Sequence, residues 1–221
     1  MYFATNIQSL DLLIQRHYTN ILKLLRFIIL MICIFCCSEN PSDDRSHFVF
    51  RYNEYGNITS LDPAFSINLP NIWATTHLFN GLVQLNDELE VIPDIAKHWS
   101  ISTDGLKYDF QLREDVFFHP HSAFGKKNTR KVIASDFVFS FQRLLDPKLA
   151  TPGGWVLQNV DQIEEIDAHR LRITLKQPFP PFLGLLSMRY CSVIPKEVVN
   201  KTGADFRKNP IGTGPFMFKN W

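Results

Sequence analysis

Residues 99–119 read WSISTDGLKYDFQLREDVFFH, and this stretch decides the fold class. Trp99 and Ile101 alternate with polar residues, and Asp104-Gly105 has the composition of a tight turn. After the turn, apolar and polar residues alternate again. The apolar ones are Tyr108, Phe110 and Leu112. The pattern predicts an antiparallel hairpin with one buried face and one face in water.

A second hairpin is predicted at 163–175, with its turn at 167–169 and alternating apolar residues after the turn. Aromatic and β-branched residues predict a further strand at Phe48–Tyr52. Since helical patterns lie between and after these strands, the sequence indicates an α/β or mixed α+β fold.

Helices are expected at 71–80, 136–145 and 182–188, where apolar residues recur at helical spacing. Pro70 suits the first turn of the first of these helices, and Gly81 is placed to cap its end. Ser135 is a suitable N-cap for the second.

The first 37 residues have the pattern of an export signal. Phe27–Cys36 is an uninterrupted apolar run of ten residues, and basic residues precede it. A membrane span needs about 20 residues, so the run suits a signal peptide better. A cysteine and a polar segment follow, as in a bacterial lipoprotein signal, which predicts lipid attachment at Cys37. Cys36 is the alternative attachment site, and a cleaved secretory peptide or an uncleaved anchor are the alternative fates.

Charge and cysteine content exclude several classes of protein. The whole chain has 23 basic and 22 acidic residues. Without residues 1–37, which hold three basic residues and one acidic residue, 20 and 21 remain, a net charge of −1. A nearly neutral domain has no electrostatic preference for nucleic acid. Cys191 is the one cysteine outside the N-terminal segment, which excludes a disulfide scaffold.

No catalytic motif stands out in the sequence. The nucleophile elbow, the zinc-protease helix motif and the Walker A loop are all absent from it. His119 and His121 could be a pair of metal ligands, but no cysteine or carboxylate pair lies close to them in sequence. Residues 125–131 form a basic loop, which indicates either a solvated loop or a partner site. We therefore expect a binding protein with no cofactor and no metal, and not an enzyme.

Seven short motifs in order carry a resemblance to a known family. They are Ser60-Leu61-Asp62-Pro63, Leu78-Phe79-Asn80-Gly81-Leu82, Pro93-x-x-Ala96-x-x-Trp99, the stretch Asp104–His119, Ala134–Phe141, Thr174-Leu175-x-x-Pro178 and Pro210-x-Gly212-Thr213-Gly214-Pro215-Phe216. On these residues the chain resembles the bacterial extracellular solute-binding proteins of family 5, the receptors of peptide and nickel ABC importers.

The resemblance implies a periplasmic-binding-protein type II clamshell, in which two lobes close on an extended ligand. It places the chain in the N-terminal portion of such a protein, with the first lobe and a small additional domain but without the second lobe. The expected segments are a signal at 1–37, a linker at 38–47, lobe I at 48–95, the small domain at 96–175 and a truncated return to lobe I at 176–221.

The resemblance also implies a site. Ser66, Ile67, Asn68 and Leu69 correspond to a strand that lines the cleft. A second contact falls on Gly153, with Trp155 two residues further on. Trp155 follows a Pro-Gly-Gly loop, where an aromatic side chain lines a cleft or packs in the core.

The implied function is the binding of oligopeptides for import, in the periplasm or at the cell surface. The expected partners are the peptide, the permease subunits of an ABC importer and, through the lipid anchor, the membrane, with the protein itself a monomer. The alternatives are another solute, such as nickel, haem or a saccharide, and a truncated remnant without function.

Overall fold

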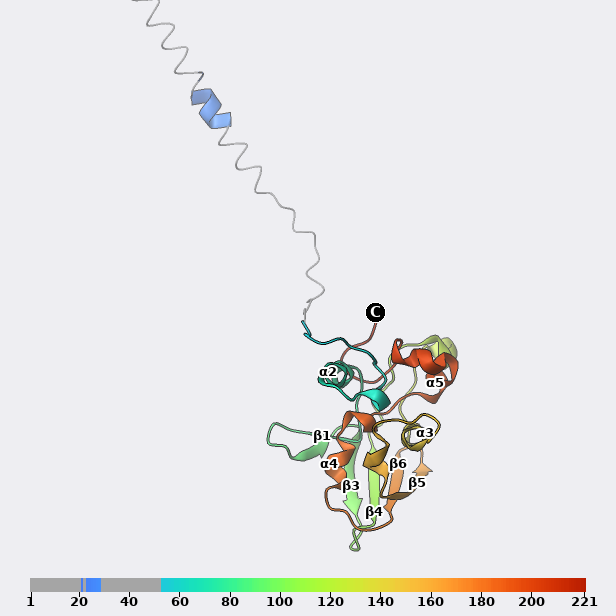
Figure 1. Cartoon of the computed structure of the whole chain (residues 1–221). Coiled ribbons are helices and arrows are strands. Elements are labelled where there is room, and N and C mark those ends of the chain that lie inside the picture. The colour runs from blue at the N-terminus through green and yellow to red at the C-terminus, as the bar shows by residue number, and fades with distance from the viewer. Residues whose placement is uncertain (1–20, 22, 29–52) are drawn as a thin grey trace, which may run out of the picture. The chain divides into compact units, whose positions relative to one another are not determined.

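The computed structural model describes residues 21, 23–28 and 53–221. Residues 1–52 and 53–221 form two separate units, and the second carries the fold (Figure 1). Residues 21 and 23–28 are helical, whereas the predicted strand Phe48–Tyr52 and the predicted lipid site at Cys37 lie outside the described residues. Within the described ranges, no helix has both the length and the apolar character that a membrane span requires.

A four-stranded antiparallel sheet in the order β3-β4-β6-β5 is the centre of the second unit (Figure 1). Its strands are β3 (Ala96–Ile101), β4 (Lys107–Leu112), β5 (Val160–Asp167) and β6 (Arg170–Leu175). Both predicted hairpins are confirmed, and they join through the pairing of Tyr108 with Ile173 and of Phe110 with Leu171. All four of these side chains are buried, so alternation along β4 and β6 does build one apolar face.

Helix α3 (Ala134–Leu145) packs against β5 and β6 and buries Phe137, Phe141 and Leu144. The prediction of Ser135 as its N-cap is wrong, because the helix begins at Ala134, two residues earlier than predicted, and Ile133 stands at the N-cap. The Asp136 carboxylate accepts a hydrogen bond of 3.0 Å from the Ile133 N–H. This bond satisfies one of the free N–H groups at the start of the helix and so shifts that start toward the N-terminus.

Helix α2 (Leu69–Leu78) lies, with α5 (Lys196–Thr202), at the end of the sheet away from the β3–β4 turn (Figure 1). Pro70 is in its first turn, as predicted. Gly81 does not cap it, because α2 ends at Leu78 and the chain is already extended at Phe79.

Several short elements complete the unit. They are the strand pair β1 (Val83–Leu85) and β2 (Val91–Pro93), helix α4 (Phe182–Leu186), and the 3-10 turns η1 (Pro63–Phe65), η2 (Ser122–Lys127), η3 (Gly154–Leu157), η4 (Arg189–Cys191) and η5 (Gly203–Arg207). The apolar stretch predicted to be helical at 182–188 is confirmed by α4. No sequence pattern predicted β1, β2 or α5.

Three of the seven motifs that carry the family resemblance meet in one hydrogen-bond network. The Asn80 side chain donates to both carboxylate oxygens of Asp94, at 3.0 and 3.2 Å, and accepts from the Thr213 hydroxyl at 3.0 Å. Gly81 N–H also donates to Asp94, at 3.0 Å. The network therefore fixes the end of α2 against the start of β3 and against the segment near residue 213.

Candidate ligand-binding site

The segment Ser66–Leu69 is not the strand that was predicted. Ser66 and Ile67 are irregular, Asn68 is the N-cap of α2, and Leu69 is the first residue of the helix. The reason is local: the Asn68 Oδ1 accepts a hydrogen bond of 2.9 Å from the Asn71 N–H, and Pro70 is preorganised for a first turn.

Ser66 anchors this segment to α2, whereas two of its apolar side chains are exposed. The Ser66 hydroxyl is buried and lies 3.1 Å from the Thr75 hydroxyl in α2. Ile67 and Leu69, by contrast, are 62% and 51% exposed. The polar side chains of the segment are therefore fixed by hydrogen bonds, while its apolar side chains face solvent.

Gly153 and Trp155 lie on the η3 turn. Gly153 is buried, whereas Trp155 is 53% exposed and lines a shallow cavity of about 390 Å³ with Phe179 and Leu185. The ring of Tyr190 covers the α-carbon of Gly153: a β-carbon there would overlap the ring and lie 2.8 Å from the Tyr190 Cβ.

Tyr190 packs on one of the predicted site residues, Gly153. Its element, η4, contacts both η1 and α2, and its ring packs on Gly153 next to Trp155. Sequence reasoning missed Tyr190, although the Pro-Gly-Gly of residues 152–154 is a signal that another chain segment approaches closely. Burial raises the pKa of Tyr190 above its ordinary value, so its hydroxyl stays protonated at neutral pH.

Arg189 fixes η4 from the buried side. Its guanidinium donates to the Phe79 carbonyl at 3.3 Å, and burial lowers its pKa while the nearby Asp94 carboxylate opposes that shift. Burial likewise raises the pKa of Asp94, against the hydrogen bonds from Gly81 and Asn80. The two opposite charges partly offset each other's burial, and the bond from Arg189 to Phe79 joins η4 to the end of α2.

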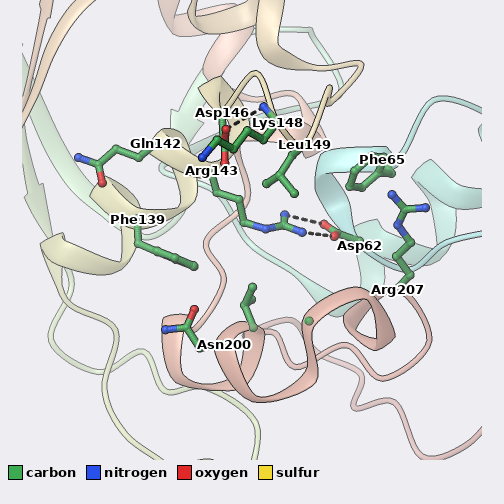
Figure 2. A pocket seen from close by; sticks show the side chains of 12 residues that line it. Asp62, Phe65, Phe139, Gln142, Arg143, Asp146, Lys148, Leu149, Asn200 and Arg207 are labelled. Atoms are coloured by element: carbon green, nitrogen blue, oxygen red, sulfur yellow. Dashed lines mark hydrogen bonds and ion pairs between the residues drawn. The ribbon is translucent and has the colours of Figure 1, made fainter.

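A larger cavity, of about 840 Å³, lies between η1, α3, α5 and η5 (Figure 2). Figure 2 shows the Arg143 guanidinium facing the Asp62 carboxylate, with Phe139 to one side. Across the cavity, the Arg207 guanidinium lies 3.8 Å from the centre of the Phe65 ring. The lining thus combines an ion pair, a second arginine and the rings of Phe65 and Phe139. The sequence did not predict this cavity.

The two histidines considered as metal ligands have structural partners instead. The His119 Nε2 lies 2.7 Å from the Gly214 carbonyl oxygen, and the His121 Nδ1 accepts from the Ala123 N–H at 3.1 Å. Over the residues that the structure describes, no cluster of three or more His, Cys, Asp or Glu could hold a metal ion.

The basic loop at 125–131 is tied to the body of the unit. Arg130 forms ion pairs with Asp136 and Glu197, and its guanidinium also lies over the Phe118 ring. The charge of Arg130 is therefore balanced within the protein and does not require a binding partner.

Comparison with known proteins places these features in a family. Residues 90–221 match the family model of the bacterial extracellular solute-binding proteins, family 5 middle region. Among curated proteins, the chain is 36% identical over 179 residues to di/tripeptide-binding protein 2 of Pseudomonas aeruginosa, covering 73% of this chain and 33% of the relative.

Two solved structures agree with this match. The periplasmic binding protein DppA from Helicobacter pylori, in complex with the peptide STSA, is 32% identical with a TM-score of 0.66, over 74% of this chain and 35% of that one. NikZ from Campylobacter jejuni, in complex with Ni(L-His), is 31% identical with a TM-score of 0.65, over 75% and 32%. The predicted fold class is thereby confirmed for a portion of a type II periplasmic binding protein. The chain spans about a third of the length of these relatives.

Proposed function

Because the chain belongs to the bacterial extracellular solute-binding proteins of family 5, we propose that it contributes peptide-binding surface to the receptor of an ABC importer. The exposed segment Ile67–Leu69 is the observation that carries the proposal. The side chains of Ile67 and Leu69 face solvent, while those of Ser66 and Asn68 make hydrogen bonds within the protein.

The main chain of this segment is suited to a peptide ligand. Among the hydrogen bonds within residues 53–221, none uses the Asn68 N–H or the Ile67 carbonyl. An extended peptide carries one donor and one acceptor per residue and pairs with such groups whatever its sequence. Ile67, Leu69 and Trp155 then offer apolar contacts to its side chains. Broad recognition of peptides follows from this combination.

Relatives' names support the ligand class. The Pseudomonas relative is a di/tripeptide-binding protein, and the Helicobacter structure holds a peptide of four residues. For the whole protein we further propose export to the periplasm or cell surface, delivery to permease subunits, and action as a monomer. The segment map with a small domain at 96–175 belongs to the same proposal, supported by the sheet that begins at Ala96 and ends at Leu175.

Anchoring through a lipid on Cys37 is a separate part of the proposal, and the apolar run before that cysteine supports it. Cells that express the full chain should incorporate labelled palmitate into it. Cys37→Ser should abolish incorporation, whereas Cys36→Ser should not. Incorporation into the Cys37→Ser variant would contradict attachment at this residue.

A second ligand class is favoured by the likeness to NikZ, which is solved with Ni(L-His). Calorimetric titration of the full chain distinguishes the two. We expect saturable heat with Ser-Thr-Ser-Ala and with Ala-Ala-Ala, and none with nickel plus L-histidine. Heat with the nickel complex alone would favour the second class. No heat with any of the three would contradict binding by this chain and favour a remnant without function.

A further inference from the structure

The Tyr190 hydroxyl belongs to a ring that packs on Gly153 of the proposed site. Among the hydrogen bonds within residues 53–221, none uses this hydroxyl, although the ring that carries it is half-buried. We propose that the Tyr190 hydroxyl donates a hydrogen bond to the bound peptide, and that Gly153 is a positioning residue that sets the place of the ring. The inference rests on the proposed function and adds a specificity-determining residue to it.

The ring cannot sit where it does with any other residue at position 153. A β-carbon on Gly153 would overlap both Cγ and Cδ1 of Tyr190, which are the base of the ring and not its flexible end. Relief would require the whole side chain to turn away. The observed position of the Tyr190 ring therefore requires glycine at 153 for steric reasons.

Both segments that meet at this contact are held by local hydrogen bonds. On one side, the Thr151 hydroxyl donates to the Leu144 carbonyl at 2.6 Å, and Gly154 N–H donates to the Thr151 carbonyl at 3.4 Å. On the other side, the Cys191 N–H donates to the Met188 carbonyl at 2.9 Å, and the Cys191 side chain is fully buried. A side chain held between two fixed segments loses little entropy when a ligand arrives.

The chemistry of the group suits a peptide. A tyrosine hydroxyl donates one hydrogen bond, and a peptide carbonyl is an acceptor with two lone pairs. Since burial raises the pKa of Tyr190, the donor persists over the neutral range. Its element, η4, contacts η1 and α2, the two elements that flank residues 66–68, and our proposal is that a peptide bound along that segment reaches the hydroxyl.

Calorimetric titration of the full chain with Ser-Thr-Ser-Ala at pH 7 tests the inference. Tyr190→Phe keeps the ring and removes the donor, and we expect about a 5- to 10-fold weaker affinity. Gly153→Ala should weaken binding by at least as much and alter the tyrosine signal in near-ultraviolet circular dichroism. The double variant should bind no more weakly than Gly153→Ala, because both changes remove the same contact. Tyr55→Phe, at an 86% exposed tyrosine, is the matched control and should bind as the wild type.

The outcomes separate the two proposals. If the wild type binds and Tyr190→Phe binds equally well, the hydroxyl makes no contact and this inference is overturned while peptide binding stands. If the wild type gives no heat, peptide binding itself is overturned, and the role of Tyr190 with it. Tyr190→Phe leaves the packing on Gly153 intact, so it decides the matter even if Gly153→Ala does not fold.

Discussion

Arg143 and Asp62 form a doubly hydrogen-bonded ion pair between residues 81 positions apart in the sequence. Their side chains are only 10% and 1% exposed. Asp62 also accepts the Ala64 N–H at 3.1 Å, and so caps the η1 turn that leads into Ser66–Leu69. The pair therefore ties the proposed ligand-contacting segment to helix α3.

Replacing Arg143 should lower the free energy of unfolding of the protein. Arg143→Met leaves the Asp62 carboxylate buried without its partner, and such changes cost about 3–5 kcal/mol. We expect a fall of that size in the free energy of unfolding, measured by urea denaturation followed by circular dichroism. Arg113→Met removes an exposed pair with Asp115 and should cost about 0–1 kcal/mol. Equal losses in the two variants would show that burial of the Asp62 pair does not matter.

Glycine is required at positions 212 and 214 by close packing. A β-carbon on Gly214 would lie 2.5 Å from the His77 carbonyl oxygen, and one on Gly212 would lie 2.8 Å from Phe79 Cδ1. Each Gly→Ala change should lower the free energy of unfolding by about 1–3 kcal/mol, as overpacked sites do. Gly184→Ala in α4 is the control: a β-carbon there meets nothing within 4 Å, so the thermal melting temperature should hold or rise. A drop at Gly184 as large as at Gly212 would contradict the steric account.

Much of this architecture could be predicted from local pattern alone. Both hairpins followed from alternation, because one face of β4 and of β6 is buried and the other is not. The helix boundaries could not, since they depend on which side chain satisfies the free N–H groups. At α3 that group is Asp136, which follows the predicted cap Ser135 by one residue and the observed N-cap Ile133 by three.

The stability contributed by Asp94 should depend on pH with a definite sign. Burial raises the pKa of Asp94 above 3.8, so the folded state holds the proton more tightly than the unfolded state. Its contribution is fully present below pH 3.8 and is lost as the pH rises through the folded pKa. The free energy of unfolding of the wild type, minus that of Asp94→Asn, should therefore fall with rising pH.

Asp104 supplies the opposite case. The hydrogen bond from Ser102 lowers its pKa below 3.8, so its contribution is present above that pH and is lost as the pH falls through the folded pKa. The free energy of unfolding of the wild type, minus that of Asp104→Asn, should therefore rise with pH. Parallel slopes for the two variants, measured by urea denaturation at each pH, would refute the assigned causes.

Cys191 should be inert while the protein is folded. The residue is fully buried, and burial raises the pKa of its thiol to about 12. Iodoacetamide at pH 8 should leave the peptide that contains Cys191 unmodified, whereas the same treatment in urea should alkylate it, as mass spectrometry of the digest would show. Equal modification in both conditions would mean that the interior around α4 and η4 opens freely.

The candidate site was harder to predict than the sheet. The residues Ser66–Leu69 were identified by resemblance, but their conformation was not, because Asn68 and Pro70 start a helix where a strand was expected. Tyr190 left no trace in any periodic pattern. It joins the site only through contact with Gly153, 37 positions away in the sequence, and such contacts are set by tertiary packing.

Hydrogen exchange of the full chain, with and without saturating Ser-Thr-Ser-Ala, tests the central claim most directly. We predict slower exchange with the peptide in two places, the amides of residues 66–69 and those of residues 153–157, and no change at the β3–β4 turn around Gly105. Slower exchange confined to the segments that line the cavity in Figure 2, or no change while calorimetry records binding, would contradict the proposed site.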